Sequence, residues 1–216
     1  MKRILIVEDH AIVRMGIDFL ITDLFQPVDV HQASNFTSAL ALLHKNVFDL
    51  IVLDINIPGG ENSRMINKIR AIQPSVKILV FSGSEEEIYA LHYIHAGANG
   101  FLSKGASEDE YRIAIMAVLN NGKYISSKVQ QQMVKNILDS KYVSSNPLED
   151  LSKRELEVMH LLAQGKWTKE IATLLNLKET TISTYKARIF EKLEVANIIE
   201  MFKKLELYKT KDFDLN

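Results

Sequence analysis

The chain has 216 residues, of which 47% are hydrophobic and 25% charged, and its formal net charge at pH 7 is −1. This composition is ordinary for a globular protein of one or two domains, and no apolar stretch approaches the roughly 18 residues of a membrane span, which excludes an integral membrane protein. Cysteine is absent, which excludes disulfides and thiolate chemistry and fits a reducing compartment, so we expect a cytoplasmic protein. Because the net charge is near zero, nucleic-acid binding would require a local basic surface.

Residues 1–122 alternate short apolar runs with segments of helical periodicity. The apolar runs, each of which predicts a buried strand, are Ile4–Val7, Val28–His31, Leu50–Leu53, Val76–Phe81 and Gly100–Leu102. The segments that predict helices are 11–24, 35–44, 61–72, 85–95 and 107–120. This alternation is typical of an α/β domain, with a doubly wound five-stranded parallel sheet covered on both faces by helices. Right-handed crossovers then bring the C-terminal ends of all strands to one edge, where ligands bind.

The remainder of the chain has a different pattern. Residues 123–148 are polar and weakly helical, which predicts a linker with one helix; the alternative is a sixth helix packed on the first domain. Residues 149–208 are helical throughout and predict a small all-α domain of four helices, whose second and third helices, about 168–175 and 179–192, form a helix-turn-helix. Ser152 and Glu155 have the spacing of a capping box at the first of these helices. The last residues, 209–216, are expected to be frayed.

Carboxylates follow two of the predicted strands. Asp54 ends the third apolar run, and Glu8 and Asp9 follow the first. Three converging carboxylates repel one another, and a bound Mg²⁺, which prefers oxygen ligands, would relieve that repulsion. The cation would also shield an incoming phosphoryl group, so that the Asp54 carboxylate could attack phosphorus and form an acyl phosphate.

Two further polar residues are expected at the same edge. Lys104 follows the fifth predicted strand, and Ser82 ends the fourth. Each alone has an ordinary structural explanation, as a solvated lysine or a turn-capping serine. Together with the acids they indicate a phosphoryl-transfer site, in which the Lys104 ammonium pairs with the phosphoryl group.

These residues carry a family resemblance. Residues 1–122 resemble the receiver domain of two-component response regulators in Glu8-Asp9, Asp54 with Pro58-Gly59, Ser82-Gly83, and the segment from Gly97 to Ala106 with Lys104. The resemblance implies that Asp54 is the phosphoacceptor and that Glu8, Asp9 and Asp54, with the Asn56 backbone carbonyl, bind Mg²⁺. It also implies that Ser82 and Phe101 form a switch pair, in which the hydroxyl moves inward on phosphorylation and the ring follows.

The C-terminal residues resemble a second family. Leu151–Phe202 are similar to the LuxR-type helix-turn-helix of response regulators of the NarL/FixJ class, in Leu151-Ser-Lys-Arg-Glu155, Gly165, Lys169-Glu-Ile-Ala172 and the segment from Thr181 to Leu193. The third helix would then enter the major groove of double-stranded DNA. The residues expected to contact bases or phosphates are Lys169, Lys178, Thr180, Ser183, Thr184, Lys186, Ala187, Arg188 and Lys192.

Two features of this domain are unusual for a helix-turn-helix: the residue before its second helix and the apolar residues of its fourth helix. Trp167 occupies a usually small, polar position before the second helix, where it would either pack as a hydrophobic staple or contact the sugar–phosphate backbone; packing is the favoured expectation. The fourth helix has more apolar residues than one buried face requires, so a residue left exposed there would make a two-fold contact between chains.

The sequence therefore predicts a DNA-binding transcriptional regulator, not an enzyme, which accepts a phosphoryl group on Asp54 from a sensor histidine kinase and forms a homodimer at least when phosphorylated. One alternative is a DNA-binding regulator whose receiver does not switch. Another is a Mg²⁺-dependent phosphoaspartyl hydrolase, although such enzymes have an Asp-x-Asp pair after the first strand and this chain has Asp54-Ile-Asn56 after the third.

Overall fold

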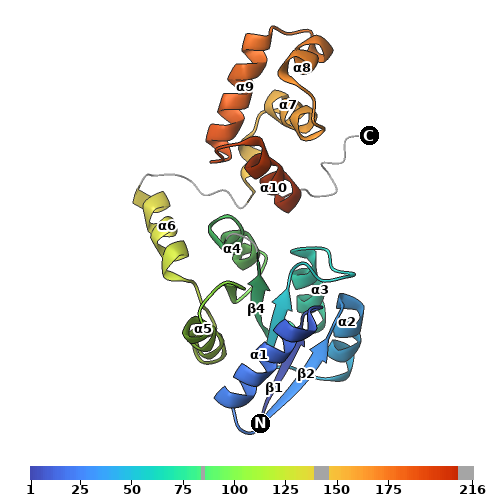
Figure 1. The fold of residues 1–216 in the computed structure, drawn as a ribbon, viewed down its shortest axis with the longest axis vertical. Helices are drawn as coiled ribbons and strands as arrows, with labels where there is room; N and C mark the ends of the chain where they lie inside the picture. Colours follow the sequence, from blue (N-terminus) through green and yellow to red (C-terminus); the bar gives the residue numbers. More distant parts are fainter. Residues whose placement is uncertain (84–85, 139–145, 209–216) are drawn as a thin grey trace. The chain divides into compact units, whose positions relative to one another are not determined.

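The computed structural model describes residues 1–83, 86–138 and 146–208, so the predicted tail, 209–216, lies outside the described residues. Contacts divide the chain into an N-terminal unit, Met1–Asp139, and a C-terminal unit, Ser140–Asn216 (Figure 1). Each unit has a hydrophobic core of its own. None of the described helices is long and apolar enough to cross a membrane.

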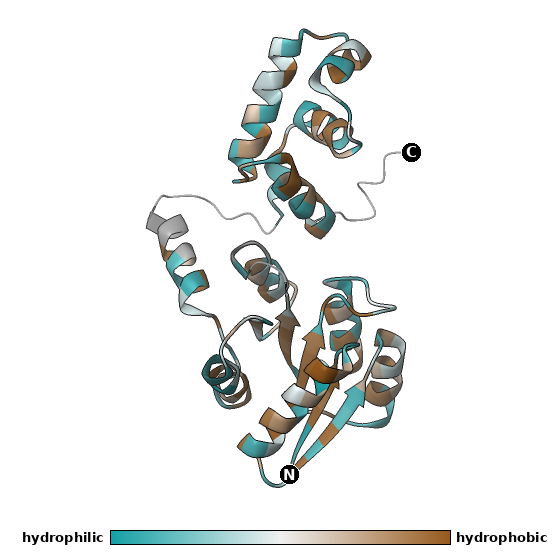
Figure 2. Cartoon of the chain, in the orientation of Figure 1, coloured by the Kyte–Doolittle hydropathy of each residue, from teal (hydrophilic) through white to brown (hydrophobic). Residues whose placement is uncertain are grey.

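The N-terminal unit is built on a parallel sheet with the strand order β2-β1-β3-β4-β5. Its strands are β1 (Lys2–Val7), β2 (Val28–Ala33), β3 (Leu50–Asp54), β4 (Lys77–Ser82) and β5 (Gly100–Ser103). All five predicted strands are confirmed within two residues of their expected ends. The interior strands β1, β3 and β4 are mostly buried, as continuous apolar runs require, whereas β2 lies at the edge and is only partly buried. Figure 2 shows the hydrophobic colouring of the interior strands.

Helices cover both faces of this sheet. One face packs against α1 (Ala11–Leu24) and α5 (Glu108–Asn121), whose buried side chains join Ile4, Val52 and Phe81 in one core. The other helices are α2 (Phe36–Lys45), α3 (Arg64–Ile72) and α4 (Glu86–His95). Phe101 of β5 is buried and stacks on Tyr93 of α4, with ring centroids 6.1 Å apart. The predicted doubly wound α/β domain is therefore confirmed.

The helix expected within the linker is α6 (Ser127–Leu138), and it lies against α4 with Val129 fully buried. The segment before α6, around Tyr124, is hydrogen-bonded to the start of β5. The Tyr124 amide donates to the Asn99 carbonyl, and the Tyr124 backbone lies 2.9 Å from the point where a Cβ on Gly100 would stand, which explains the glycine. In this structure α6 therefore packs on the N-terminal unit. The division of the chain into a domain of residues 1–122, a linker of residues 123–148 and a domain of residues 149–208 stays a prediction.

The C-terminal unit is all helical. After a short 3₁₀ turn, η1 (Pro147–Asp150), its helices are α7 (Lys153–Ala163), α8 (Thr168–Leu175), α9 (Glu179–Lys192) and α10 (Ile198–Tyr208). The capping box is confirmed: the Glu155 amide donates to Ser152 Oγ at 3.3 Å, and the Ser152 amide donates to Glu155 Oε2 at 2.8 Å. Asn176 ends α8 in the left-handed conformation, with φ of 52°, and this tight turn joins α8 to α9.

Candidate functional site

The acidic residues singled out in the sequence meet at the C-terminal edge of the sheet. Glu8 and Asp9 follow β1, and Asp54 is the last residue of β3. Glu8 and Asp54 are each 1% exposed, and Asp9 is half-buried. Potential ligand atoms of these three residues and of His10 all lie within 4.8 Å of one another. The arrangement gathers carboxylate oxygens closely enough to share one cation.

Lys104 bridges the two buried acids of this cluster. Its Nζ is 2.9 Å from Asp54 Oδ2, to which it donates a hydrogen bond, and 2.7 Å from Glu8 Oε2. Burial alone would lower the pKa of Lys104, but the contacts with Glu8 and Asp54 outweigh burial and raise it. The ammonium therefore stays charged and partly neutralises the two buried acids.

The donor set fits a hard cation. Glu8 Oε2 and Asp9 Oδ1 are buried and accept no hydrogen bond within the described part of the chain. Lys104 Nζ lies 2.7 Å from Glu8 Oε2, and His10 Nδ1 lies 2.9 Å from Asp9 Oδ1, so each oxygen has one ion-pair neighbour. Buried carboxylate oxygens with an unused lone pair are suitable ligands for a divalent cation that prefers oxygen.

His10 and Arg14 support the acids, and the sequence did not single out either for a role. His10 Nδ1 lies 3.0 Å from Glu8 Oε1 and 2.9 Å from Asp9 Oδ1. The hydrogen bond with Glu8, followed by the charge of Asp9, raises the pKa of His10. The Arg14 guanidinium donates to the Glu8 carbonyl at 2.7 Å and so fixes the turn after β1. The position of His10 directly after the acid pair was the one signal in the sequence.

The remaining predicted residues of this edge lie close by. Ser82 ends β4 and is fully buried, and its carbonyl accepts a hydrogen bond from the Lys104 amide at 2.7 Å. The Asn56 amide donates to Asp54 Oδ1 at 3.0 Å, which fixes the loop after β3. Phe101 points into the core beside α4 rather than toward the acids. These positions are compatible with the expected roles, which stay predictions.

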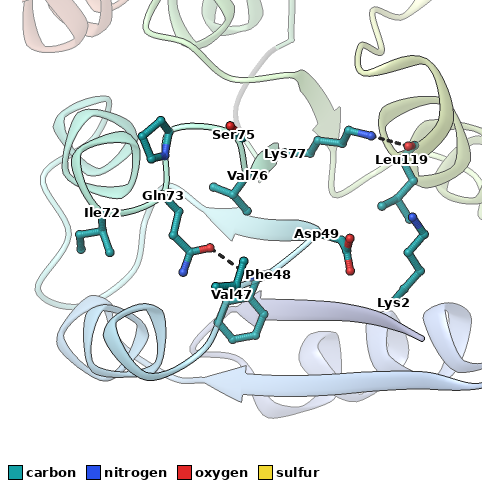
Figure 3. Close-up of a pocket in the computed structure, with 11 residues that line it drawn as sticks. Lys2, Val47, Phe48, Asp49, Ile72, Gln73, Ser75, Val76, Lys77 and Leu119 are labelled. Carbon is teal, nitrogen blue, oxygen red and sulfur yellow. Dashed lines mark hydrogen bonds between the residues drawn. The ribbon is translucent and has the colours of Figure 1, made fainter.

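The N-terminal unit has two hollows, one far from the acidic cluster and one beside it. One, of about 460 Å³, is at the opposite end of the sheet, where Lys2 and Lys77 begin their strands (Figure 3). Its polar groups serve the fold, since the Gln73 amide donates to the carbonyls of Leu43 and Asn46 and Lys77 donates to Leu119. The second, of about 430 Å³, lies between α1 and α5 and is lined by Lys104. It therefore borders the acidic cluster.

The C-terminal unit presents a basic face on α9. Ile182, Ile189 and Leu193 are fully buried, with Tyr185 and Phe190 packed beside them. The predicted contact residues that are exposed are Lys169, Lys178, Thr180, Ser183, Thr184, Ala187, Arg188 and Lys192. Lys186 is half-buried, with its Nζ 5.4 Å from the centre of the Phe190 ring. An exposed helical face that mixes cations and hydroxyls suits contact with a duplex.

Lys192 has a second set of contacts that the sequence did not indicate. Its Nζ lies 2.8 Å from Glu155 Oε2 and 3.0 Å from the Asp150 carbonyl oxygen. Its ammonium therefore joins the end of α9 to the end of η1 and the start of α7. A contact of Lys192 with DNA stays a prediction.

Comparison with known proteins gives a consistent result for both units. A model of the response regulator receiver domain matches residues 4–116, and a model of the bacterial regulatory proteins of the luxR family matches residues 149–205. Response regulator UvrY of Escherichia coli (strain K12) is 32% identical over 201 residues, which are 93% of this chain and 92% of that protein. Response regulator GacA of Pseudomonas aeruginosa is 31% identical over 201 residues, 93% of this chain and 94% of that protein.

A solved structure extends the likeness to the fold of the whole chain. RcsB from Salmonella enterica serovar Typhimurium, bound to promoter DNA in the presence of the phosphomimetic BeF₃⁻, is 25% identical with a TM-score of 0.79. The match covers 96% of this chain and 99% of RcsB. The acidic edge lies within the segment matched by the receiver model, and α9 lies within the segment matched by the luxR model.

Proposed function

Because the chain belongs to the two-component response regulators that join a receiver domain to a LuxR-type DNA-binding domain, we propose that phosphorylation of Asp54 controls its affinity for DNA. The observation that carries this proposal is the cluster at the sheet edge, in which the buried Asp54 carboxylate shares Lys104 with Glu8. A family of regulators rather than enzymes also argues against the phosphoaspartyl hydrolase.

The chemistry follows from the charges at this edge. An Asp54 carboxylate oxygen attacks the phosphorus of a phosphohistidine, the new O–P bond replaces the N–P bond, and the imidazole leaves with a proton from solvent. Glu8, Asp9 and Asp54, with the Asn56 carbonyl, would hold Mg²⁺, which supplies charge neutralisation for the phosphoryl oxygens when bound. Lys104, now shared by two carboxylates, would move its ammonium to a phosphoryl oxygen.

The same edge offers a route from phosphorylation to the surface. Once Lys104 and the Ser82 hydroxyl turn toward the phosphoryl group, the space around β4 and β5 changes. Phe101 stacks on Tyr93 of α4, so movement of its ring would alter how α4 packs. Phosphorylation then shifts the population between two arrangements of α4 and its neighbours.

The phosphodonor partner is proposed to be a sensor histidine kinase. The phosphohistidine must approach the acids from outside the sheet edge, where α1 begins. Ile12, Met15 and Phe19 of α1 are exposed apolar residues, and Phe19 also lines the hollow that contains Lys104. An apolar surface of this kind beside a reactive pocket supports a protein donor.

The proposed target is double-stranded DNA, bound by a homodimer in the cytoplasm. Arg188 and Lys178 would contact phosphates or bases from α9, and Lys169 would add a phosphate contact from α8. Exposed apolar residues on α10, Ile199 and Phe202, support a two-fold contact between chains.

The experiment compares the wild-type protein with Asp54→Asn after incubation with Mg²⁺ and a small acyl phosphate. We expect the intact mass of the wild type to increase by one phosphoryl group, which hydroxylamine removes, and its affinity for DNA fragments selected from the genome to rise by about 5- to 150-fold. The Asp54→Asn protein should show neither change.

Each alternative has its own outcome. Absence of the adduct, or its persistence in Asp54→Asn, would refute Asp54 as the acceptor. An adduct without any change in DNA affinity would favour the regulator that does not switch. Sustained release of phosphate from a small phosphoester would favour the hydrolase.

A further inference from the structure

Trp167 is exposed at the start of α8, although the sequence favoured its packing within the domain. Its exposed fraction is 79%, so the expectation of a buried staple is wrong. Tryptophan is on average one of the more buried residue types, and an exposed indole has a large apolar surface with one N–H donor. Such a side chain is suited to contact with a binding partner.

The surroundings of Trp167 favour an anionic partner. Lys166 precedes it, and Lys169 is exposed in the first turn of α8. Glu170, three residues further along, accepts a hydrogen bond from the Trp167 backbone amide, whose nitrogen lies 2.6 Å from Glu170 Oε2. Because Glu170 already occupies this amide, an approaching anion would meet the two lysines and the indole rather than that backbone group.

The helix-turn-helix arrangement indicates which anion this is. In this motif the recognition helix enters the major groove, and the helix before it crosses the DNA backbone. Here α9 is the recognition helix, and α8 packs on it through the tight turn at Asn176. The first residues of α8 are therefore at an end of the motif that reaches a phosphate strand.

We propose that Trp167 is a DNA-backbone contact, with its ring against a deoxyribose and its Nε1–H donating to a phosphate oxygen. This inference rests on the proposed DNA-binding function. The indole is uncharged, so its contribution to DNA binding should depend on salt differently from that of a lysine or arginine. Removing a lysine or arginine that neutralises a phosphate reduces the dependence of binding on salt, whereas removing Trp167 should weaken binding at every salt concentration and leave that dependence unchanged.

Trp167 is the only tryptophan in the sequence, so its fluorescence reports on this site alone. The experiment titrates the full-length protein, treated with Mg²⁺ and a small acyl phosphate, with a mixed-sequence duplex at low salt. We expect the indole emission to be quenched or shifted as the duplex binds, and acrylamide to reach the ring less easily in the complex. Binding followed by a labelled duplex without any change in emission or acrylamide access would overturn the proposal.

Variants make the test quantitative. Trp167→Ala should lower duplex affinity by about tenfold, the effect of losing roughly one hydrogen bond to a charged group. Trp167→Phe keeps an aromatic ring but no N–H, and should recover only part of the loss. Leu174→Ala is the matched control, because Leu174 is a 59% exposed apolar residue of the same helix, and it should bind like the wild type.

The outcomes separate this inference from the function on which it rests. If Arg188→Ala reduces the salt dependence of binding while Trp167→Ala binds like the wild type, DNA binding stands and the Trp167 contact is refuted. The Trp167 contact with DNA is also refuted if Trp167→Ala and Leu174→Ala weaken duplex binding equally. It is refuted as well if Trp167→Ala binds the duplex normally but no longer binds a protein partner. If no duplex binds any variant, the proposed function itself fails. An unchanged melting temperature for Trp167→Ala confirms that the variant is folded.

Discussion

Glu155 is a buried carboxylate whose charge is balanced by hydrogen bonds and an ion pair. The carboxylate is 3% exposed, and it accepts the Ser152 amide while pairing with Lys192 from the far end of α9. Burial by itself would raise the pKa of Glu155, but the hydrogen bonds from Lys192 and Ser152 outweigh burial and lower it. The pair therefore joins the start of α7 to the end of α9 within one core.

Removing Lys192 alone should be costly. We expect Lys192→Met to destabilise the C-terminal unit by about 1 kcal/mol, because Glu155 is left as a buried carboxylate without its cation, while solvent around the 39% exposed Lys192 side chain weakens the pair. The double variant Glu155→Gln, Lys192→Met should regain much of this loss, since no unpaired charge remains. Urea unfolding followed by circular dichroism measures both, and equal stabilities of the two variants would contradict the argument.

The same pair sets a dependence on pH. Since the folded-state pKa of Glu155 lies below its ordinary value of 4.5, its stabilising effect is present above that pH and is lost as the pH falls through the folded value. The double variant should therefore lose less stability in acid than the wild type.

At the scale of an element, α10 has two faces of different character. Met201, Leu205 and Leu207 are buried in the core of the C-terminal unit. Ile198, Ile199 and Phe202 remain exposed, with Ile199 at 70%. The described core cluster of the C-terminal unit does not include these three residues, and the two-fold contact proposed for them accounts for their apolar character.

A charge on this face should separate dimerisation from folding. We expect Ile199→Glu to weaken DNA binding by at least about tenfold, because two linked recognition helices bind more tightly than one, while the melting temperature changes little. Glu206→Gln, an exposed change on the same helix, should leave binding unaltered. Fluorescence anisotropy with a labelled duplex and sedimentation of the phosphorylated protein test this, and unaltered binding by Ile199→Glu would exclude the contact.

At the scale of the whole molecule, the chain has two separate cores. The N-terminal core joins the sheet to α1 and α5, and the C-terminal core joins η1 to the four helices after it. No residue belongs to both of these described clusters. Each unit therefore has the buried apolar surface that independent folding requires.

Two fragments test this independence. We expect residues 1–139 to fold and to accept a phosphoryl group on Asp54 without binding DNA. Residues 140–216 should fold and bind a duplex with an affinity that the phosphodonor does not change, because the regulated unit has been removed. Circular dichroism and DNA titrations are the measurements, and a fragment that stays unfolded would show that the two cores depend on each other.

The sequence by itself determined the parallel sheet, the helix-turn-helix and the gathering of Glu8, Asp54 and Lys104, because each follows from local periodicity and from where a polar residue ends an apolar run. The bounds of α8 and α9 were likewise fixed by local signals. Only the tertiary structure decided that Trp167 is exposed and that Lys192 is bound to Glu155. It also decided that α6 lies against α4. Such facts depend on which surfaces of distant elements meet, and helical periodicity gives a residue's face but not the partner that covers it.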